Sequence, residues 1–267
     1  MIIEGKVVLI TGASGGFGGA LAREFARARS RIALCGRDRN KLDSLAEELR
    51  SDGAMAEAFV HDLCDLEGAP ALVETVESRL GPVAVLINNA GGATTGLVAD
   101  IPVAEFIEAL RSNLLGAIAL TKAALPRMLE RKDGSIVFIS SGAALRALPA
   151  YAPYSAAKAG LSAFADSLRA ELRGCGVTVI TIYPGKLATQ FDQRSRRYGE
   201  PLAAPRGGGS LPARIAKRVL RAVRNDKSIV MIRGAAWAAA WLGRLAPALV
   251  DRILAGRAKM AGKCPRR

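Results

Sequence analysis

A tyrosine and a lysine four residues apart form a pair in this sequence that is suited to proton transfer. Tyr154 and Lys158 fall in a run of helical character, so both side chains would project from one face of a helix. A nearby ammonium group favours tyrosinate and lowers the pKa of the phenol, which makes Tyr154 a usable acid or base near neutral pH. Ser141 follows an apolar run and can donate a hydrogen bond to a carbonyl oxygen. A Tyr-x-x-x-Lys pair is also common on partly exposed helix faces, so the spacing alone does not define an active site.

A glycine-rich segment near the N-terminus is suited to binding phosphate. It follows an apolar run, where a helix is expected to begin, and reads Thr11-Gly12-Ala13-Ser14-Gly15-Gly16-Phe17-Gly18. Its glycines allow a sharp turn and a close approach to a pyrophosphate, and the helix N-terminus supplies amide groups. Turns between strands and helices use glycine for other reasons too, but the position after the first expected strand favours nucleotide binding.

The residues after the second expected strand bear on the choice of nucleotide. At this place in dinucleotide folds an acidic residue bonds the ribose hydroxyls, whereas an arginine accommodates a 2′-phosphate. Here Gly36 is followed by Arg37, which favours NADP(H). The alternative is a solvated arginine beside a helix-capping Asp38. After the third strand, Asp62 is placed to accept a hydrogen bond from the adenine amino group, or to act as an ordinary loop or cap residue.

Histidine and cysteine usage excludes several kinds of site. His61 is the single histidine, so neither a Ser-His-Asp triad nor a histidine metal cluster is expected, and no metal is predicted. The four cysteines are dispersed and form no CxxC pair. Dispersed thiols suit a reducing compartment, so the sequence predicts a cytoplasmic protein.

The elements that must position these residues alternate along the chain. Short β-branched runs are separated by segments of helix length, a spacing that implies a parallel sheet covered on both faces. Ligands bind such sheets beyond the carboxyl ends of the strands. The expected strands are Lys6–Ile10, Arg31–Cys35, Ala56–Val60, Val83–Ile87, Ser135–Ile139, Val177–Tyr183 and, less clearly, Ser228–Ile232. The expected helices are Phe17–Ala28, Asn40–Arg50, Ala71–Leu80, Val103–Leu129, Ser155–Arg173 and Pro212–Asn225.

Charge is distributed unevenly over the 267 residues. Half of the residues are apolar, which excludes intrinsic disorder. Residues 1–193 contain 20 Lys and Arg against 21 Asp and Glu, whereas residues 194–267 contain 18 against 3. The basic part begins with residues 193–212, which are expected to form a mobile loop. Its residues Arg194, Arg196 and Arg197 either meet a carrier phosphate or an acidic substrate or, as we favour, are solvated.

Residues 234–267 form a basic and apolar extension with a predicted helical part. Trp237, Trp241 and several aliphatic residues stand among the cations of Gly234–Met260. That composition suits a helix lying on an anionic membrane surface, and equally a helix packed over the substrate pocket or at a subunit interface. The segment is too short and too interrupted to be a convincing membrane span. Nucleic acid is disfavoured, because no zinc pattern or RNA-binding signature accompanies the charge.

Taken in order, these motifs resemble the short-chain dehydrogenase/reductase family. The resemblance covers residues 4–190 closely and residues up to 232 weakly. It is carried by Thr11-Gly-x-x-x-Gly16-x-Gly18, Asn88-Asn89-Ala90-Gly91, Asn113, Ser141, Tyr154-x-x-x-Lys158 and Pro184-Gly185-x-x-x-Thr189. It implies an α/β protein with a single Rossmann-type domain over residues 1–233, built on a doubly wound parallel sheet of about seven strands.

The resemblance also implies a role for each site residue. Tyr154 would be the general acid–base, and Lys158 would lower its pKa and bind the nicotinamide ribose. Ser141 would orient the carbonyl group, Asn113 would hold a water that links Lys158 to a proton relay, and Thr189 would fix the nicotinamide carboxamide. The expected cofactor-binding set is Thr11, Gly12, Ser14, Gly16, Phe17, Gly18, Arg37, Asp62, Asn89, Ala90, Gly91, Tyr154, Lys158, Pro184, Gly185 and Thr189.

These expectations describe an NADP(H)-dependent oxidoreductase that interconverts a ketone and a secondary alcohol, with an apolar or lipid-like carbonyl compound as substrate. The alternative is a catalytically silent scaffold that binds NADP(H) or a membrane. Relatives with an arginine after the second strand usually prefer NADP(H), but many of them carry a basic residue in the glycine loop where this chain has Gly15. Family members usually form dimers or tetramers, so a homodimer or homotetramer is expected.

Overall fold

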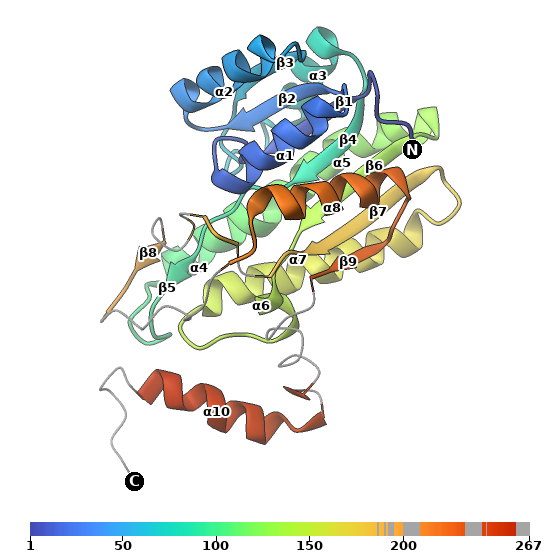
Figure 1. Cartoon of the computed structure of the whole chain (residues 1–267). Helices are drawn as coiled ribbons and strands as arrows, with labels where there is room; N and C mark the ends of the chain where they lie inside the picture. The colour runs from blue at the N-terminus through green and yellow to red at the C-terminus, as the bar shows by residue number, and fades with distance from the viewer. Residues whose placement is uncertain are drawn as a thin grey trace.

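Apolar runs form seven parallel strands in a single sheet. The computed structural model describes residues 1–185, 187–189, 191, 195–199, 209–232, 242–243 and 245–259. The sheet order is β3-β2-β1-β4-β6-β7-β9, so the chain winds outward in both directions from β1 (Figure 1). The strands are β1 (Val7–Thr11), β2 (Arg31–Gly36), β3 (Ala56–Val60), β4 (Val83–Asn88), β6 (Gly134–Ile139), β7 (Val177–Tyr183) and β9 (Ile229–Met231). The predicted doubly wound, seven-stranded parallel sheet is confirmed.

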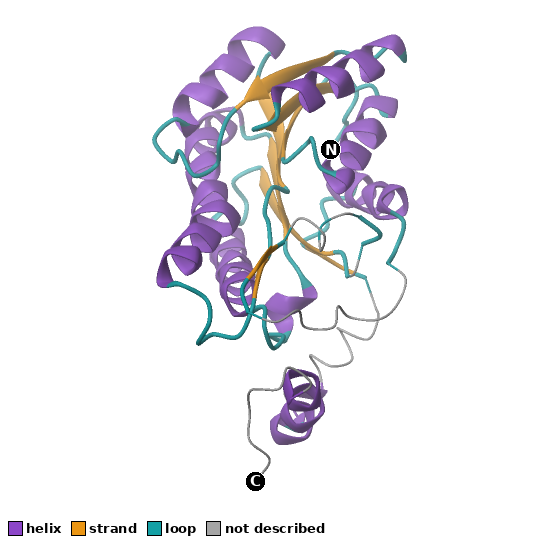
Figure 2. Cartoon of the chain, turned by 90° about the vertical axis from the view of Figure 1, so that its left-hand side faces the viewer, coloured by secondary structure: helices purple, strands orange, loops and turns teal. Residues whose placement is uncertain are grey.

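Helices cover both faces of this sheet, which Figure 2 shows edge-on between two helical layers. Because successive strand residues point to opposite faces, Val8 joins one buried cluster and Leu9 the other. The first cluster lies under α1 (Gly16–Arg27), α2 (Arg39–Ser51) and α8 (Pro212–Arg224). The second lies under α3 (Ala69–Leu80), α5 (Gly116–Arg131) and α7 (Ala152–Glu171). Apolar residues on both faces of each strand therefore explain why the sheet is buried on both sides.

The segment Val103–Leu129 is helical throughout, as expected, but a π turn that was not expected separates two α-helices within it. The segment contains α4 (Val103–Leu110), a π-helical turn over Arg111–Leu115, and α5. A π turn adds one residue to the helical circuit, which re-aims the side chains that follow, and such turns are frequent at functional sites. Asn113 lies in the middle of this turn and is buried.

A two-stranded parallel ribbon joins the loop after β4 to the segment expected to be mobile. It pairs β5 (Thr94–Thr95) with β8 (Arg196–Arg197). Ser210 makes a further bridge to Leu187, and α8 follows. Most of the expected mobile loop, including Arg194, lies outside the described residues, so its mobility stays a prediction.

The C-terminal extension contains a described helix, α10 (Pro247–Lys259), which Figure 1 shows beyond the short helix α6 (Gly142–Leu145). Val250 is buried, and Asp251 forms an ion pair with Arg146. Trp237 and Trp241 lie outside the described residues. Among the residues that the structure does describe, no helix is both long and apolar enough to cross a bilayer.

Candidate active site

A buried threonine holds the carboxyl ends of β1 and β4 together. The Thr11 hydroxyl donates to the carbonyl of Ile87 (3.3 Å) and accepts from the amides of Asn89 (2.9 Å) and Ala90 (3.0 Å). In return, the Asn89 side-chain amide donates to the Thr11 carbonyl (2.8 Å). The turn Asn89–Gly91 is therefore fixed against the start of the glycine loop.

The glycine loop passes too close to its neighbours for side chains at two positions. Gly12 has φ +64°, and a Cβ there would lie 2.8 Å from Cα of Ala90. A Cβ at Gly18 would overlap the Gly12 carbonyl oxygen. Gly15 is the N-cap residue of α1 and has no side chain, so it cannot accept hydrogen bonds from the amides of the first helical turn through a side chain. This is the arrangement that a pyrophosphate group fits.

Two other predicted residues of the loop, Ser14 and Gly16, lie near the segments that end β2 and follow β7. Phe17 is buried, and Ser14 is close to Gly36 at the end of β2. A Cβ built at Gly16 would lie 3.4 Å from Cγ2 of Thr189, so the loop and the segment after β7 are neighbours. Thr189 accepts a hydrogen bond from the Phe191 amide (3.3 Å).

Arg37 and Asp62 follow adjacent strands and form a loose ion pair. Arg37 Nη1 lies 3.8 Å from Asp62 Oδ2, and the arginine side chain is 72% exposed. Asp62 also accepts a hydrogen bond from the Cys64 amide (3.0 Å). Asp38 caps α2 by accepting from the Lys41 amide (3.2 Å), so the capping role considered for this residue is confirmed. The guanidinium of Arg37 is thus mostly exposed at the carboxyl edge of the sheet.

Tyr154 and Lys158 lie one turn apart on α7, beside the end of β6. Lys158 Nζ is 5.9 Å from the centre of the Tyr154 ring and donates to the carbonyl of Ile139 (3.0 Å). Its side chain is almost fully buried, and this burial lowers its pKa to about 8 because the charged form loses hydration. Ser141 caps α6, with its Oγ accepting from the Ala143 amide (3.2 Å). The Ser141 hydroxyl proton is not used in that bond.

Two further serines, which were not predicted from the sequence, hold α7 against β6 by hydrogen bonds. Ser140 Oγ and Ser162 Oγ are 2.7 Å apart and buried. Ser162 donates to the carbonyl of Lys158 (3.0 Å). The only signal for this contact was the Ser140-Ser141 pair at the end of an expected strand.

Asn113 faces Lys158 across a space that Gly91 leaves open. Its side-chain nitrogen donates to the carbonyls of Gly92 and Ala109, each at 3.0 Å. Its Oδ1 is buried and has no hydrogen-bond partner among the described residues. A Cβ at Gly91 would overlap this Oδ1 and lie 3.4 Å from Lys158 Nζ. The lack of a side chain at Gly91 thus leaves an acceptor and an ammonium group facing the same small space.

The segment after β7 covers the tyrosine and is tied to α4. Pro184 and Gly185 (φ +69°) turn the chain, and the Phe191 ring lies 5.6 Å from the Tyr154 ring at 58°. Farther along, Arg196 pairs with Glu105 (3.2 Å) and Glu108 (2.9 Å) on α4. Arg196 is therefore ion-paired, and the expectation that it is simply solvated was wrong.

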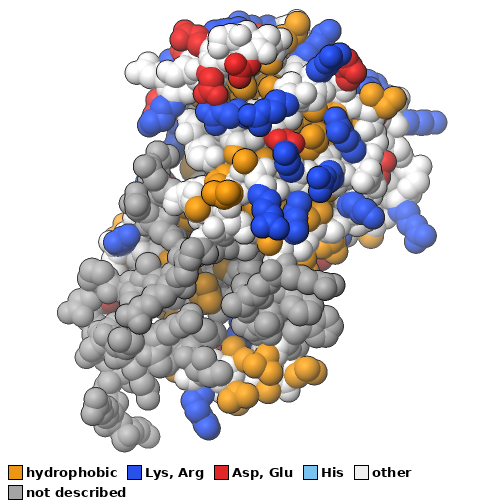
Figure 3. All heavy atoms as spheres, in the orientation of Figure 1, with side chains coloured by type: hydrophobic (Ala, Val, Ile, Leu, Met, Phe, Trp, Pro, Cys, Tyr) orange, Lys and Arg blue, Asp and Glu red, His pale blue; other side chains and the backbone are white. Residues whose placement is uncertain are grey.

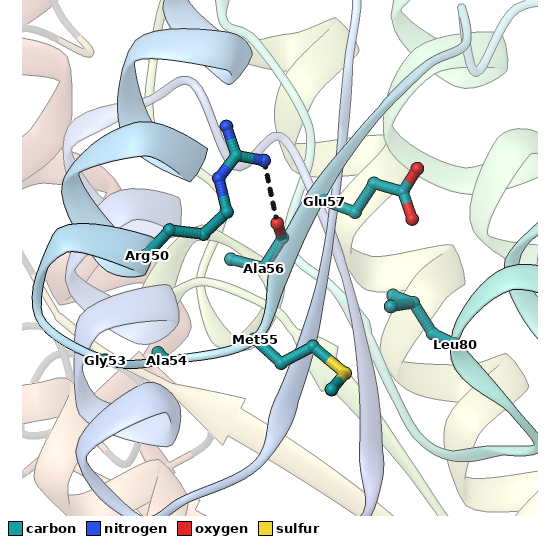
Figure 4. A pocket seen from close by; sticks show the side chains of 7 residues that line it. All are labelled: Arg50, Gly53, Ala54, Met55, Ala56, Glu57 and Leu80. Atoms are coloured by element: carbon teal, nitrogen blue, oxygen red, sulfur yellow. Dashed lines mark hydrogen bonds between the residues drawn. The ribbon is translucent and has the colours of Figure 1, made fainter.

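A surface depression lies at the opposite, amino-terminal edge of the sheet, as Figure 4 shows. Arg50 donates to the carbonyl of Ala56 (3.2 Å), and Glu57 points away from Arg50 and pairs with Arg79. The lining is completed by Gly53, Ala54, Met55 and Leu80. Its two charged lining residues therefore both have partners, Arg50 in the backbone and Glu57 in Arg79.

This chain is similar to several known proteins. Residues 6–198 match the family model described as short chain dehydrogenase. A dehydrogenase/reductase SDR family protein 7-like from Anopheles gambiae is 36% identical, with 96% of this chain and 84% of the relative covered. The ketoacyl reductase HetN from a Nostoc strain is 33% identical, with 94% and 88% covered. The solved structure of an actinorhodin polyketide ketoreductase variant with NADPH has a TM-score of 0.79 and 28% identity, with 86% of this chain and 97% of that chain covered.

The chain therefore belongs to the short-chain dehydrogenase family, and it is an oxidoreductase that acts at CH–OH or C=O groups. Similar solved structures contain NADPH, a derivative of NADP, or NAD. Structures with this fold therefore contain either NADP-type or NAD cofactors, and the fold alone does not determine which cofactor this chain binds.

Proposed function

We propose that this protein is an NADP(H)-dependent reductase that interconverts a ketone and a secondary alcohol and works on an apolar carbonyl substrate. One observation supports the proposal most directly. At the carboxyl edge of the sheet, where the glycine loop leads into α1, the structure also has Tyr154, Lys158, Ser141 and Asn113. When bound, a nicotinamide cofactor supplies or accepts the hydride in such a reaction.

The side chains of this edge provide the complementary proton chemistry. The hydroxyl proton of Ser141 is available to a substrate carbonyl oxygen, because Ser141 Oγ only accepts from the Ala143 amide. Tyr154 delivers a proton to the same oxygen during reduction and removes it during oxidation. Lys158 is mostly protonated at neutral pH, since its pKa is about 8, and its charge stabilises the tyrosinate. Asn113 Oδ1 accepts from a water that connects Lys158 to solvent.

A tyrosine variant tests the mechanism. Tyr154→Phe should abolish turnover while NADPH binding persists, because only the acid–base hydroxyl is removed. Turnover that survived this change would remove Tyr154 from the mechanism. A catalytically silent cofactor-binding protein would bind NADPH equally well in wild-type and variant form and reduce no carbonyl compound with either.

The preference for NADP(H) depends on Arg37. Its exposed guanidinium follows β2, and no basic residue in the glycine loop assists it. Arg37→Asp should weaken NADPH binding roughly 10- to 100-fold, the effect of losing a charge-assisted hydrogen bond, and should leave NADH binding nearly unchanged. Arg29→Asp is the matched control, because it makes the same charge change at an exposed residue on the amino side of β2. An unchanged preference after Arg37→Asp would overturn the phosphate assignment.

The surroundings of the site suggest its working context. A cytoplasmic homodimer or homotetramer fits the family and the dispersed cysteines. Residues 234–267 combine cations with apolar residues, and we assign them to a membrane surface, from which an apolar substrate would be drawn. Deleting residues 234–267 should reduce binding to anionic vesicles. Equal binding by the shortened protein would leave packing against the protein as the role of the extension.

A further inference from the structure

Helix α8 divides sharply into a buried face and a cationic face. On one face, Ile215, Val219 and Val223 are almost completely buried in the cluster under α1. Its other face exposes five cations, which we name the α8 stripe: Arg214, Lys217, Arg218, Arg221 and Arg224. Figure 3, in the orientation of Figure 1, shows Lys and Arg side chains gathered where α8 runs across the surface.

The α8 stripe lacks the carboxylate partners that several other arginines have. Arg23, Arg127 and Arg169, for example, each pair with a carboxylate within the fold. Within the described part of the chain, no ion pair involves a member of the stripe. Among the described residues, the stripe is thus a block of charge without carboxylate partners, carried on a helix whose other face is packed in the core.

Helix stability does not account for this charge. Arg221 and Arg224 lie in the last turn, where cations interact favourably with the helix dipole. Arg214 lies in the first turn, where a cation is unfavourable, and no acidic residue stands there to compensate. Cations along the whole length of α8 are explained better by an anionic partner than by the helix itself.

Exposed aliphatic residues beside the stripe indicate which partner. Leu211 precedes α8 and is 69% exposed, and Ile229 begins the edge strand β9 after it and is 49% exposed. A nucleic acid backbone would gain little from such residues, whereas a bilayer accepts aliphatic side chains beneath its headgroups. Since the apolar face of α8 is already used in the core, the helix cannot insert. It can offer only its cations and these flanking residues.

We infer that the α8 stripe is an electrostatic docking surface for an anionic lipid bilayer. It is separate from the membrane role proposed above for residues 234–267 and does not depend on it. The chain enters α8 from Ser210, which pairs with Leu187 beside Thr189 at the edge of the candidate active site. Docking through α8 therefore brings that edge near the bilayer surface.

Vesicle sedimentation with the full-length protein tests the inference. The variant K217Q/R218Q/R221Q removes three cations and keeps the extension intact. Each cation near an anionic membrane surface contributes roughly fivefold to partitioning, so this variant should bind vesicles containing phosphatidylserine about 100-fold more weakly. Wild-type protein should bind phosphatidylcholine vesicles poorly, and raising salt from about 0.1 M to about 1 M should release it from the anionic ones.

The control variant K122Q/K132Q/R173Q removes three exposed cations on the opposite side of the sheet. It should bind the anionic vesicles as wild type does, and both variants should keep the wild-type melting temperature and NADPH affinity. Equal vesicle binding by the α8 variant and wild type would overturn the inference. So would tighter binding of the stripe to duplex DNA than to the vesicles, because the partner would then be a nucleic acid. Neither result bears on the reductase activity, which the Tyr154→Phe experiment tests separately.

Discussion

Burial of Lys158 couples the folding of this protein to pH. The lysine is 4% exposed, donates to the carbonyl of Ile139, and has its pKa lowered from the usual 10.5 to about 8 by burial. Between these two values, the unfolded chain holds a proton that the folded chain has released. The contribution of Lys158 to the free energy of unfolding therefore increases as pH rises through this window. Below pH 8, both states carry the charge, and the folded state bears the cost of burying it.

The size of this coupling follows from the separation of the two pKa values, which corresponds to at most about 3 kcal/mol. Lys158→Met keeps a side chain of similar length and removes the proton. The free energy of unfolding of wild type relative to this variant should rise by up to about 3 kcal/mol between pH 8 and pH 10.5. Loss of the hydrogen bond to Ile139 shifts the variant at every pH and does not alter this slope.

Urea unfolding without cofactor, repeated across this pH range, measures the effect. The titration of all other groups cancels in the difference between the two free energies of unfolding, because those groups are common to both proteins. Lys122→Met is the control, since Lys122 is exposed and its replacement should leave the slope unchanged. If wild type and Lys158→Met differed by the same free energy at every pH, the ammonium would not be held in a poorly hydrated site, and the reasoning would fail.

Two other predictions concern the loops around the site. Gly18→Ala should destabilise the fold by about 2 kcal/mol and weaken cofactor binding, because the new methyl group overlaps the backbone. The control Gly19→Ala should do neither, because the nearest neighbour of its new methyl group is a flexible arginine side chain. Urea unfolding and NADPH titration of both variants measure the two effects. Equal stability of the two would show that the loop can relax. Glu105→Gln with Glu108→Gln should speed tryptic cleavage at Arg196 several-fold at low salt, and wild type should approach the variant near 1 M salt, where exposed pairs are screened. An unchanged cleavage rate would mean that the ion pairs do not hold β8 in place.

The sheet could be predicted because its signal is local. Each strand buries both faces, so runs such as Val83–Ile87 are apolar throughout, and the expected boundaries agree with β4 to within one residue. The glycine loop and the Tyr154–Lys158 pair could be placed for the same reason. Each occupies a few consecutive residues next to a strand or within one helix, so topology alone brings them to the carboxyl edge.

Contacts between distant segments could not be predicted in this way. The ribbon of β5 and β8 has two residues per strand, too few for a pattern of alternation, and it joins segments about a hundred residues apart. The partners of Arg196 on α4 could not be predicted, for the same reason. The π turn at Asn113 could not be predicted because its sequence continues the apolar spacing of the helices on either side.

Several features that cost stability lie together in the candidate site. At the amino-terminal edge, Arg50 bonds the backbone and Glu57 pairs with Arg79, whereas the buried hydroxyl of Ser135, near the start of β6, has no partner among the described residues. At the carboxyl edge, a π turn, an Asn113 oxygen without a partner among the described residues, and a buried Lys158 meet around one open space. Each of these features costs stability, and an unpaired buried oxygen alone costs about 1–3 kcal/mol. Chains tolerate such costs together where a ligand later supplies the missing partners, which is the physical reason for placing the reaction at this edge.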